Sequence, residues 1–172
     1  MTSVKTRGAF YLGLALALAT PAFAGAQVQG DYLIVPDSRI GAISLGMSDK
    51  DLFKLGIPIQ TAPLGANTLY RYPDITITVV NSTHQVASVM VQNNRKYHTA
   101  DGVHVGSTIR DVEASNGPPE EFGGTPGPQP DGVFYRSHRL VFYFSPENSS
   151  LADRPTTTVQ WIGIETANAH NF

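Results

Sequence analysis

The sequence contains no cysteine. No disulfide can therefore stabilise the fold, no thiol can act as a nucleophile, and no lipid can be attached through an N-terminal cysteine. An exported chain of this size without cysteine is typical of the bacterial periplasm and unusual among small secreted eukaryotic domains.

A surplus of basic charge and a long apolar segment are also missing. Lysine and arginine number 12 against 14 aspartate and glutamate residues. The basic residues are scattered, whereas a nucleic-acid surface needs a contiguous basic stripe, so no nucleic-acid partner is expected. The uncharged apolar run at residues 9–19 is about half the roughly twenty residues that a bilayer span requires, so no membrane span is expected in the mature chain.

The N-terminal residues have the pattern of a secretory signal peptide. Lys5 and Arg7 precede the apolar run, and small residues then offer cleavage after Ala24 or Ala26. We therefore assign residues 1–26 to a signal peptide and expect the mature protein in the periplasm.

A sequence repeat organises most of the remaining chain. Residues 43–52 (ISLGMSDKDL) recur as residues 103–112 (VHVGSTIRDV), and each copy continues into a Gly-x-Pro segment. Later apolar positions also match, with Ile75, Ile77, Val79, Val86, Val89 and Val91 of the first copy corresponding to Leu140, Phe142, Phe144, Val159, Ile162 and Ile164. We predict a leading strand in residues 27–37, repeat 1 at 38–97, repeat 2 at 98–166 and a tail at 167–172. Within repeat 2, the Pro- and Gly-rich residues 116–132 are expected to form a loop.

Each copy begins with a helix-start signal. Ser48 and Thr108 are each followed three residues later by an aspartate, so the hydroxyl can cap the helix and the carboxylate lies at its positive end. Period-two alternation follows, most clearly in residues 75–79, and indicates an antiparallel hairpin. The sequence thus predicts an α+β fold: two tandem helix-plus-hairpin repeats in one layered body, with the helices on one sheet face.

The candidate metal ligands are His98, Asp101 and His104, at the junction of the two copies. Such spacing converges on one ion only in a helix, and Gly102 and the β-branched Val103 argue against a helix there, so we predict no metal site. These residues remain the alternative on which a small periplasmic hydrolase or ligand-binding protein would depend. No Gly-x-Ser-x-Gly elbow or phosphate-binding glycine loop is present, so we predict no catalytic residue and no cofactor.

Aromatic residues favour a protein-binding role. Val141, Tyr143 and Trp161 should lie on the sheet face opposite the helices, where the first copy has small polar residues. Tyrosine and tryptophan are typical interface anchors because they combine large apolar area with few rotatable bonds. The alternative is that the leading strand or the Pro- and Gly-rich loop covers this face.

The pattern that runs from Leu45-Gly46 through Asp51 to Gly56-x-Pro58, and then into a hairpin, resembles the outer-membrane assembly lipoprotein BamE (SmpA/OmlA) family. A tandem pair of such units is similar to the β-lactamase inhibitory protein architecture. The resemblance covers nearly all of the mature chain, and it implies a non-catalytic protein that acts through protein–protein contacts.

From the residues and the resemblance together, we expect a non-catalytic periplasmic protein-binding module. Its role would be that of an accessory or stabilising subunit of a larger envelope complex, such as a membrane-associated dehydrogenase or an assembly machine. Any contact with a membrane would then be peripheral and through that protein partner. The alternatives are a secreted enzyme inhibitor of the β-lactamase-inhibitor type and the small hydrolase or ligand-binding protein.

Overall fold

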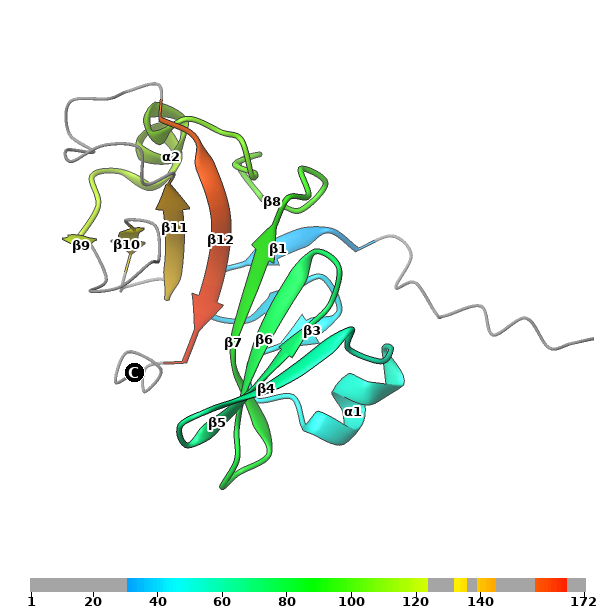
Figure 1. Cartoon of the computed structure of the whole chain (residues 1–172). Helices are drawn as coiled ribbons and strands as arrows, with labels where there is room; N and C mark the ends of the chain where they lie inside the picture. Colours follow the sequence, from blue (N-terminus) through cyan, green and yellow to red (C-terminus); the bar gives the residue numbers. More distant parts are fainter. Residues whose placement is uncertain (1–30, 124–131, 136–138, 145–156, 167–172) are drawn as a thin grey trace, which may run out of the picture.

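A computed structural model describes residues 31–123, 132–135, 139–144 and 157–166. In these ranges the chain forms two sheets and two helices (Figure 1). The small sheet has the order β3-β2-β1-β8, with strands at Leu33–Val35 (β1), Arg39–Ile40 (β2), Ile43–Ser44 (β3) and His98–Thr99 (β8). The predicted signal peptide and the predicted tail at 167–172 lie outside the described residues.

The large sheet is antiparallel throughout and has the order β4-β5-β6-β7-β12-β11-β10-β9. Its first four strands are Gln60–Leu64 (β4), Asn67–Arg71 (β5), Ile75–Val80 (β6) and Gln85–Gln92 (β7). The other four are Glu121–Gly123 (β9), Gly132–Tyr135 (β10), Leu140–Phe144 (β11) and Val159–Glu165 (β12). The strands that follow each helix therefore form one half of the sheet, and the halves join where β7 pairs with β12.

The helices are Asp49–Lys54 (α1) and Ile109–Asn116 (α2). We call α1 with β4 to β7 the first unit (49–92), and α2 with β9 to β12 the second unit (109–165). The glycine turn before each helix makes the same bond to the last strand of its unit. The Gly46 N–H donates to the Val86 carbonyl at 2.8 Å, and the Gly106 N–H donates to the Val159 carbonyl at 2.8 Å.

The predicted helix starts are confirmed. The hydroxyls of Ser48 and Thr108 each accept a hydrogen bond, at 3.2 Å, from the backbone N–H of Asp51 and Asp111 respectively. In the second unit the Asp111 carboxylate also accepts from the Thr108 N–H at 2.8 Å, which completes a capping box. Helix α2 ends at Asn116, and its C-cap residue Gly117 has a φ of 79°, in the region that favours glycine.

One apolar core lies between the two sheets. In the large sheet it takes alternate side chains of β6, β7, β11 and β12, and the small sheet contributes Ile34 and Ile40. The helices add Leu52 from α1, and Ile109 and Val112 from α2. The short strands β2 and β3 pack against β7, so the small sheet covers the middle of the large one. Figure 1 shows the helices at opposite ends of the molecule, α1 beside β4 and α2 above β11.

The α+β prediction is wrong, because the protein is mostly β. Each unit contains four strands in place of a single hairpin, and the cover over the middle of the large sheet is itself a sheet. The extra strands carry little sequence signal. The burial pattern of β4 shows no buried position, and this strand contains Pro63, which is tolerated at a sheet edge.

The structure also bears on two smaller expectations. The predicted loop at 116–132 contains strand β9 and the first residue of β10, while residues 124–131 lie outside the described part of the chain. Neither α1 nor α2, the two helices that the described residues form, is long and apolar enough to cross a bilayer.

Candidate partner-binding surface

The large sheet has a second face, which points away from the core. Because side chains alternate along a strand, the neighbours of the core residues lie on this side. We call it the outer face, and it consists of Thr76, Thr78, Ser88 and Met90 in the first unit and Val141, Tyr143, Trp161 and Gly163 in the second. The contacts of β2 and β3 with β7 are on the core side of the sheet.

Backbone pairing places the outer-face residues in continuous rows across the sheet. One row runs through Thr76, Met90, Gly163 and Val141. A second row contains Trp161, which is paired with Gln92 of β7 on one side and with Tyr143 of β11 on the other. The sheet thus brings Gln92 of the first unit next to Trp161 of the second unit at the β7–β12 seam.

The predicted anchors Tyr143 and Trp161 do lie together. Their ring centroids are 5.9 Å apart with an interplanar angle of 57°, within the range of favourable aromatic pairs. Burial raises the pKa of the Tyr143 hydroxyl to about 12, and the Glu165 carboxylate adds to the rise. Tyr143 therefore stays neutral at physiological pH.

The three predicted anchors differ in accessibility. Val141 is 2% exposed and Tyr143 is 8% exposed, whereas Trp161 is half-buried. Exposure, which an anchor needs, is thus present at Trp161 and nearly absent at the other two. Around Trp161, the half-buried residues Met90 and Gln92 extend the accessible area into the first unit.

Gly163 explains how Val141 fits within the sheet. A Cβ atom at Gly163 would lie 2.9 Å from Cγ1 of Val141, closer than real Cβ contacts. The large side chain at one position therefore requires the absence of a side chain at the paired position.

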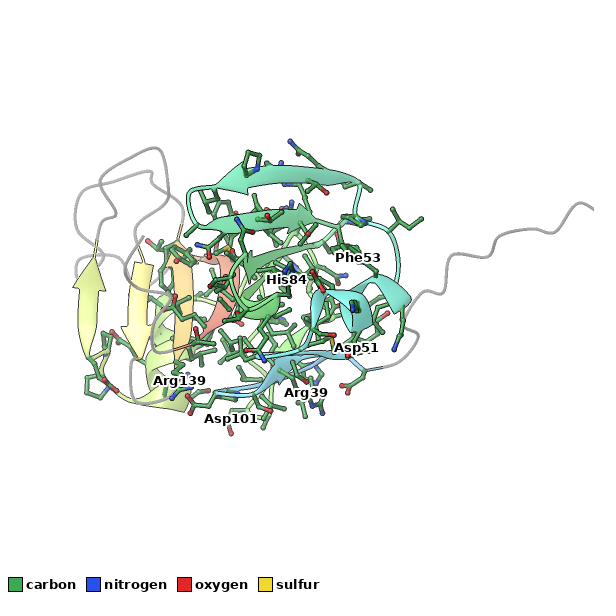
Figure 2. The ribbon with its side chains drawn as sticks, turned by 90° about the horizontal axis from the view of Figure 1, so that it is seen from below. Arg39, Asp51, Phe53, His84, Asp101 and Arg139 are labelled. Atoms are coloured by element: carbon green, nitrogen blue, oxygen red, sulfur yellow. The ribbon has the colours of Figure 1, made fainter. Side chains whose placement is uncertain are left out.

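The structure does not gather the candidate metal ligands into a site. His98 and His104 are paired through their backbones, but each imidazole has a local partner: Nδ1 of His98 is 2.9 Å from the Lys96 carbonyl, and Nδ1 of His104 is 2.9 Å from Oγ of Ser107. Asp101 is exposed in the turn between them, at the outer edge of the molecule in Figure 2. Within the described residues, no three His, Asp or Glu side chains are placed to hold a metal ion.

Sequence reasoning missed one apolar surface. Phe53, Ile57 and Ile59 are 43%, 87% and 67% exposed, and we call them the apolar patch. They lie where α1 ends and the chain enters β4. A signal was present in Gly56-Ile57-Pro58-Ile59, because two isoleucines that flank a proline after a helix end belong to no apolar period.

Comparison with known proteins gives little similarity. No protein-family model matches the sequence, and no curated protein matches it significantly. A solved structure that is similar is that of a cysteine-rich secretory protein (SAV1118) from Staphylococcus aureus, with a TM-score of 0.45 and 12% identity. The match covers 76% of this chain and 48% of that chain, so this chain corresponds to about half of its length.

The architecture of the described residues corrects the resemblance to the BamE family and to the β-lactamase inhibitory protein architecture. That resemblance rested on a helix-plus-hairpin repeat, whereas the part of the chain that the structure describes forms two short helices and two sheets of four and eight strands. The short Leu-Gly and Gly-x-Pro motifs account for it, because they specify a helix start and a helix end, which many folds contain.

Proposed function

We propose that this protein is a non-catalytic protein-binding module of the cell envelope, and that it serves as an accessory or stabilising subunit of a larger complex. The observation that carries the proposal is the position of Trp161 on the outer face. A half-buried tryptophan lies at the seam of an eight-stranded sheet, with its ring tilted against that of Tyr143 and with the polar residue Gln92 paired beside it. An accessible tryptophan is the residue type most often found as the anchor of a binding hot spot.

The rigidity of the surface supports the same role. The opposite face of the sheet is buried in the core, and β7 and β12 each have a paired strand on both sides. An anchor on such a scaffold loses little conformational entropy when it binds, so more of its contact energy appears as affinity.

The test is recovery of a partner from detergent-solubilised envelopes by the tagged mature protein, carried out with Trp161→Ala and with Ser88→Ala. Ser88 and Trp161 occupy matching positions in the two units, since Ser88 pairs with Thr78 as Trp161 pairs with Tyr143. Wild type and Ser88→Ala should recover a stoichiometric protein, and Trp161→Ala should weaken its binding by roughly 2 kcal/mol, or about 30-fold.

Thermal unfolding of the same two variants separates binding from folding. A side chain that acts mainly in the complex leaves the melting temperature of the free protein nearly unchanged. A large drop for Trp161→Ala would instead assign the indole to the core, where its loss costs about 3 to 5 kcal/mol. Recovery of wild-type protein alone, without a partner, would argue against the proposal as a whole.

A further inference from the structure

We propose that two copies of this chain associate through the edge strand β4, with Thr61 of one copy paired to Thr61 of the other and the apolar side chains around it buried between the copies. This role goes beyond the proposed function and uses a surface separate from the outer face. It would give a two-fold symmetric dimer that presents two outer faces.

Strand β4 is an open edge of the large sheet. It stands last in the strand order, and within the described residues its paired neighbour is β5 on one side only. Four of its five residues are exposed. Proteins commonly protect such edges with charged side chains or proline, and β4 contains no charged residue and a single proline, Pro63. The strand is therefore a template on which a further strand can pair.

The exposed apolar residues gather at this edge. The large apolar side chains that the described residues expose are Phe53, Ile57, Ile59 and Leu64, and all four lie in β4 or in the segment from α1 that leads into it. Figure 1 shows α1 beside β4. Apolar side chains next to unpaired backbone favour a covering strand that brings apolar side chains of its own.

The pairing with β5 shows which backbone groups of β4 are available. Leu64 and Asn67 are joined by a two-residue loop and so form a hydrogen-bonded pair, and every second residue of β4 counted from Leu64 turns its backbone groups toward β5. Thr61 and Pro63 turn theirs toward the open edge. Thr61 offers a donor and an acceptor there, whereas Pro63 offers only its carbonyl.

A second copy of β4 fits this edge. Two strands related by a two-fold axis run antiparallel, and pairing Thr61 with Thr61 of the second copy satisfies the donor and the acceptor of both. The same register places Ile59 beside Pro63 of the second copy, and Leu64 beside Pro58 of the second copy. Apolar side chains of each copy therefore meet apolar side chains of the other.

Pro63 fixes the register and keeps the pairing short. A register centred on Ala62 would press the proline ring against the Thr61 carbonyl of the second copy, because the ring stands where an N–H would point. In the Thr61-centred register the ring faces Ile59, whose N–H already donates to the Arg71 carbonyl at 2.8 Å. Neither residue has a spare N–H, so the ladder ends there. Both copies use the same edge, so the assembly closes as a dimer.

The charges near the edge are compatible with self-association. Helix α1 carries Phe53 together with Asp49, Lys50, Asp51 and Lys54, so its side-chain charges cancel. Lys54 is also bonded to Asp51, at 2.6 Å. A surface without net charge does not repel its own copy and offers nothing that would select a charged partner.

Sedimentation velocity tests the association. The mature protein, at about 1 to 500 µM, should pass from monomer to dimer with a dissociation constant in the micromolar range, because a few apolar side chains make a small interface. Ile59→Ser/Leu64→Ser should raise the dissociation constant at least about tenfold. Thr61→Pro should abolish the dimer, since it removes the central donor without removing a bond to β5. Thr61→Ala keeps that donor and is the matched control, which should dimerise like wild type.

Cross-linking tests the register. The chain has no cysteine, so a single introduced thiol reports on its own position. Opposed residues of a hydrogen-bonded antiparallel pair lie about 5.5 Å apart at Cα, so a short bismaleimide should join two copies of the Thr61→Cys variant. Ala114→Cys is the control, because Ala114 is exposed on α2 at the opposite end of the molecule, and it should stay monomeric.

Trp161→Ala should dimerise normally, so failure of this proposal and failure of partner binding at the outer face are separate results. Circular dichroism checks that each variant folds, and the cross-linking result decides the matter if the proline variant does not fold.

The proposal would be overturned by wild-type protein that stays monomeric over the whole concentration range, or by a double serine variant or a Thr61→Pro variant that dimerises like wild type. Equal cross-linking of the two cysteine variants would also overturn it. If the double serine variant instead loses an envelope protein or lipid vesicles while its self-association is unchanged, the edge belongs to that other occupant.

Discussion

The two units of the large sheet carry different side chains at matching positions of the same ladder. On the core side, Ile77 of the first unit corresponds to Phe142 of the second, and both are fully buried. On the outer face, Thr78 and Ser88 correspond to Tyr143 and Trp161. One backbone plan therefore supports a sheet half with a polar outer face and a half with an aromatic one.

The apolar surface of the first unit lies elsewhere. Its exposed apolar residues are at the end of α1 and in the segment that follows, where the chain continues through Ile57 and Ile59. In the second unit, α2 is followed by Gly117-Pro118-Pro119 instead. The comparison teaches that the buried side chains of equivalent strands fix the fold. The outer-face side chains and the segments that follow the helices can therefore differ between the two units.

The largest expected effect concerns the core. Phe142→Ala should lower the free energy of unfolding by about 3 to 5 kcal/mol, because it removes a fully buried ring and leaves a cavity. The matched change in the first unit, Ile77→Val, should cost only about 1 kcal/mol. Urea denaturation of both variants measures the two values. A smaller loss for Phe142→Ala than for Ile77→Val would show that the second unit is loosely packed.

An intermediate effect is expected at Gly163. Gly163→Ala should destabilise the protein by about 1 to 3 kcal/mol, because the new Cβ would meet Cγ1 of the buried Val141 at 2.9 Å. The first unit has a methionine, Met90, next to Gly163 in the same cross-strand row, and Met90 is paired with the smaller Thr76.

A double-mutant cycle sharpens this prediction. Val141→Ala removes the atom that a Cβ at Gly163 would meet, so the double variant should be more stable than the sum of the single changes implies. Simple additivity in urea denaturation would contradict the steric explanation.

The smallest expected losses of stability are those caused by removing the two helix-capping hydroxyls. Thr108→Ala should cost about 1 kcal/mol at neutral pH, since it removes the hydroxyl that accepts from the Asp111 N–H. Ser48→Ala should cost less, because α1 lacks the reciprocal bond that closes the capping box of α2. Melting temperatures of the two variants provide the comparison, and equal losses would mean that the reciprocal bond adds nothing.

The same cap should make α2 sensitive to acid. The backbone N–H of Thr108, followed by its hydroxyl, holds the pKa of Asp111 below its ordinary value. A lowered pKa in the folded state contributes stability above the unfolded-state value of about 4, and this contribution is lost as the pH falls through the folded-state pKa. Asp111→Asn should therefore reduce the loss of unfolding free energy that accompanies a fall in pH. An unchanged pH dependence would exclude this carboxylate as a source of the acid sensitivity.

Local signals in the sequence were sufficient for the helix starts and for the best-patterned strands. Capping depends on a hydroxyl and on a backbone N–H three residues away, so Ser48 and Thr108 could be recognised without knowledge of the rest of the fold. Period-two alternation likewise predicted β6, and the aromatic pair of Tyr143 and Trp161 followed from the same alternation in the second copy. The sequence did not reveal that Val141 and Tyr143 are nearly inaccessible. Alternation predicts on which face of the sheet a side chain lies, but it does not predict how much of that face is exposed to solvent.

Only the tertiary structure decided the architecture. Strands β2 and β3 contain two residues each, too few for any periodic pattern, and they form because β2 pairs with β1 and with β3 and because both pack against β7. The β7–β12 pairing joins Met90 to Gly163 across a long stretch of sequence, and no local rule specifies such a register. Sequence by itself determined where the helices start and which side chains of the best-patterned strands share a face, because those properties depend on neighbouring residues. Which faces meet depends on pairing between distant segments, and that is decided by the packing of the whole chain.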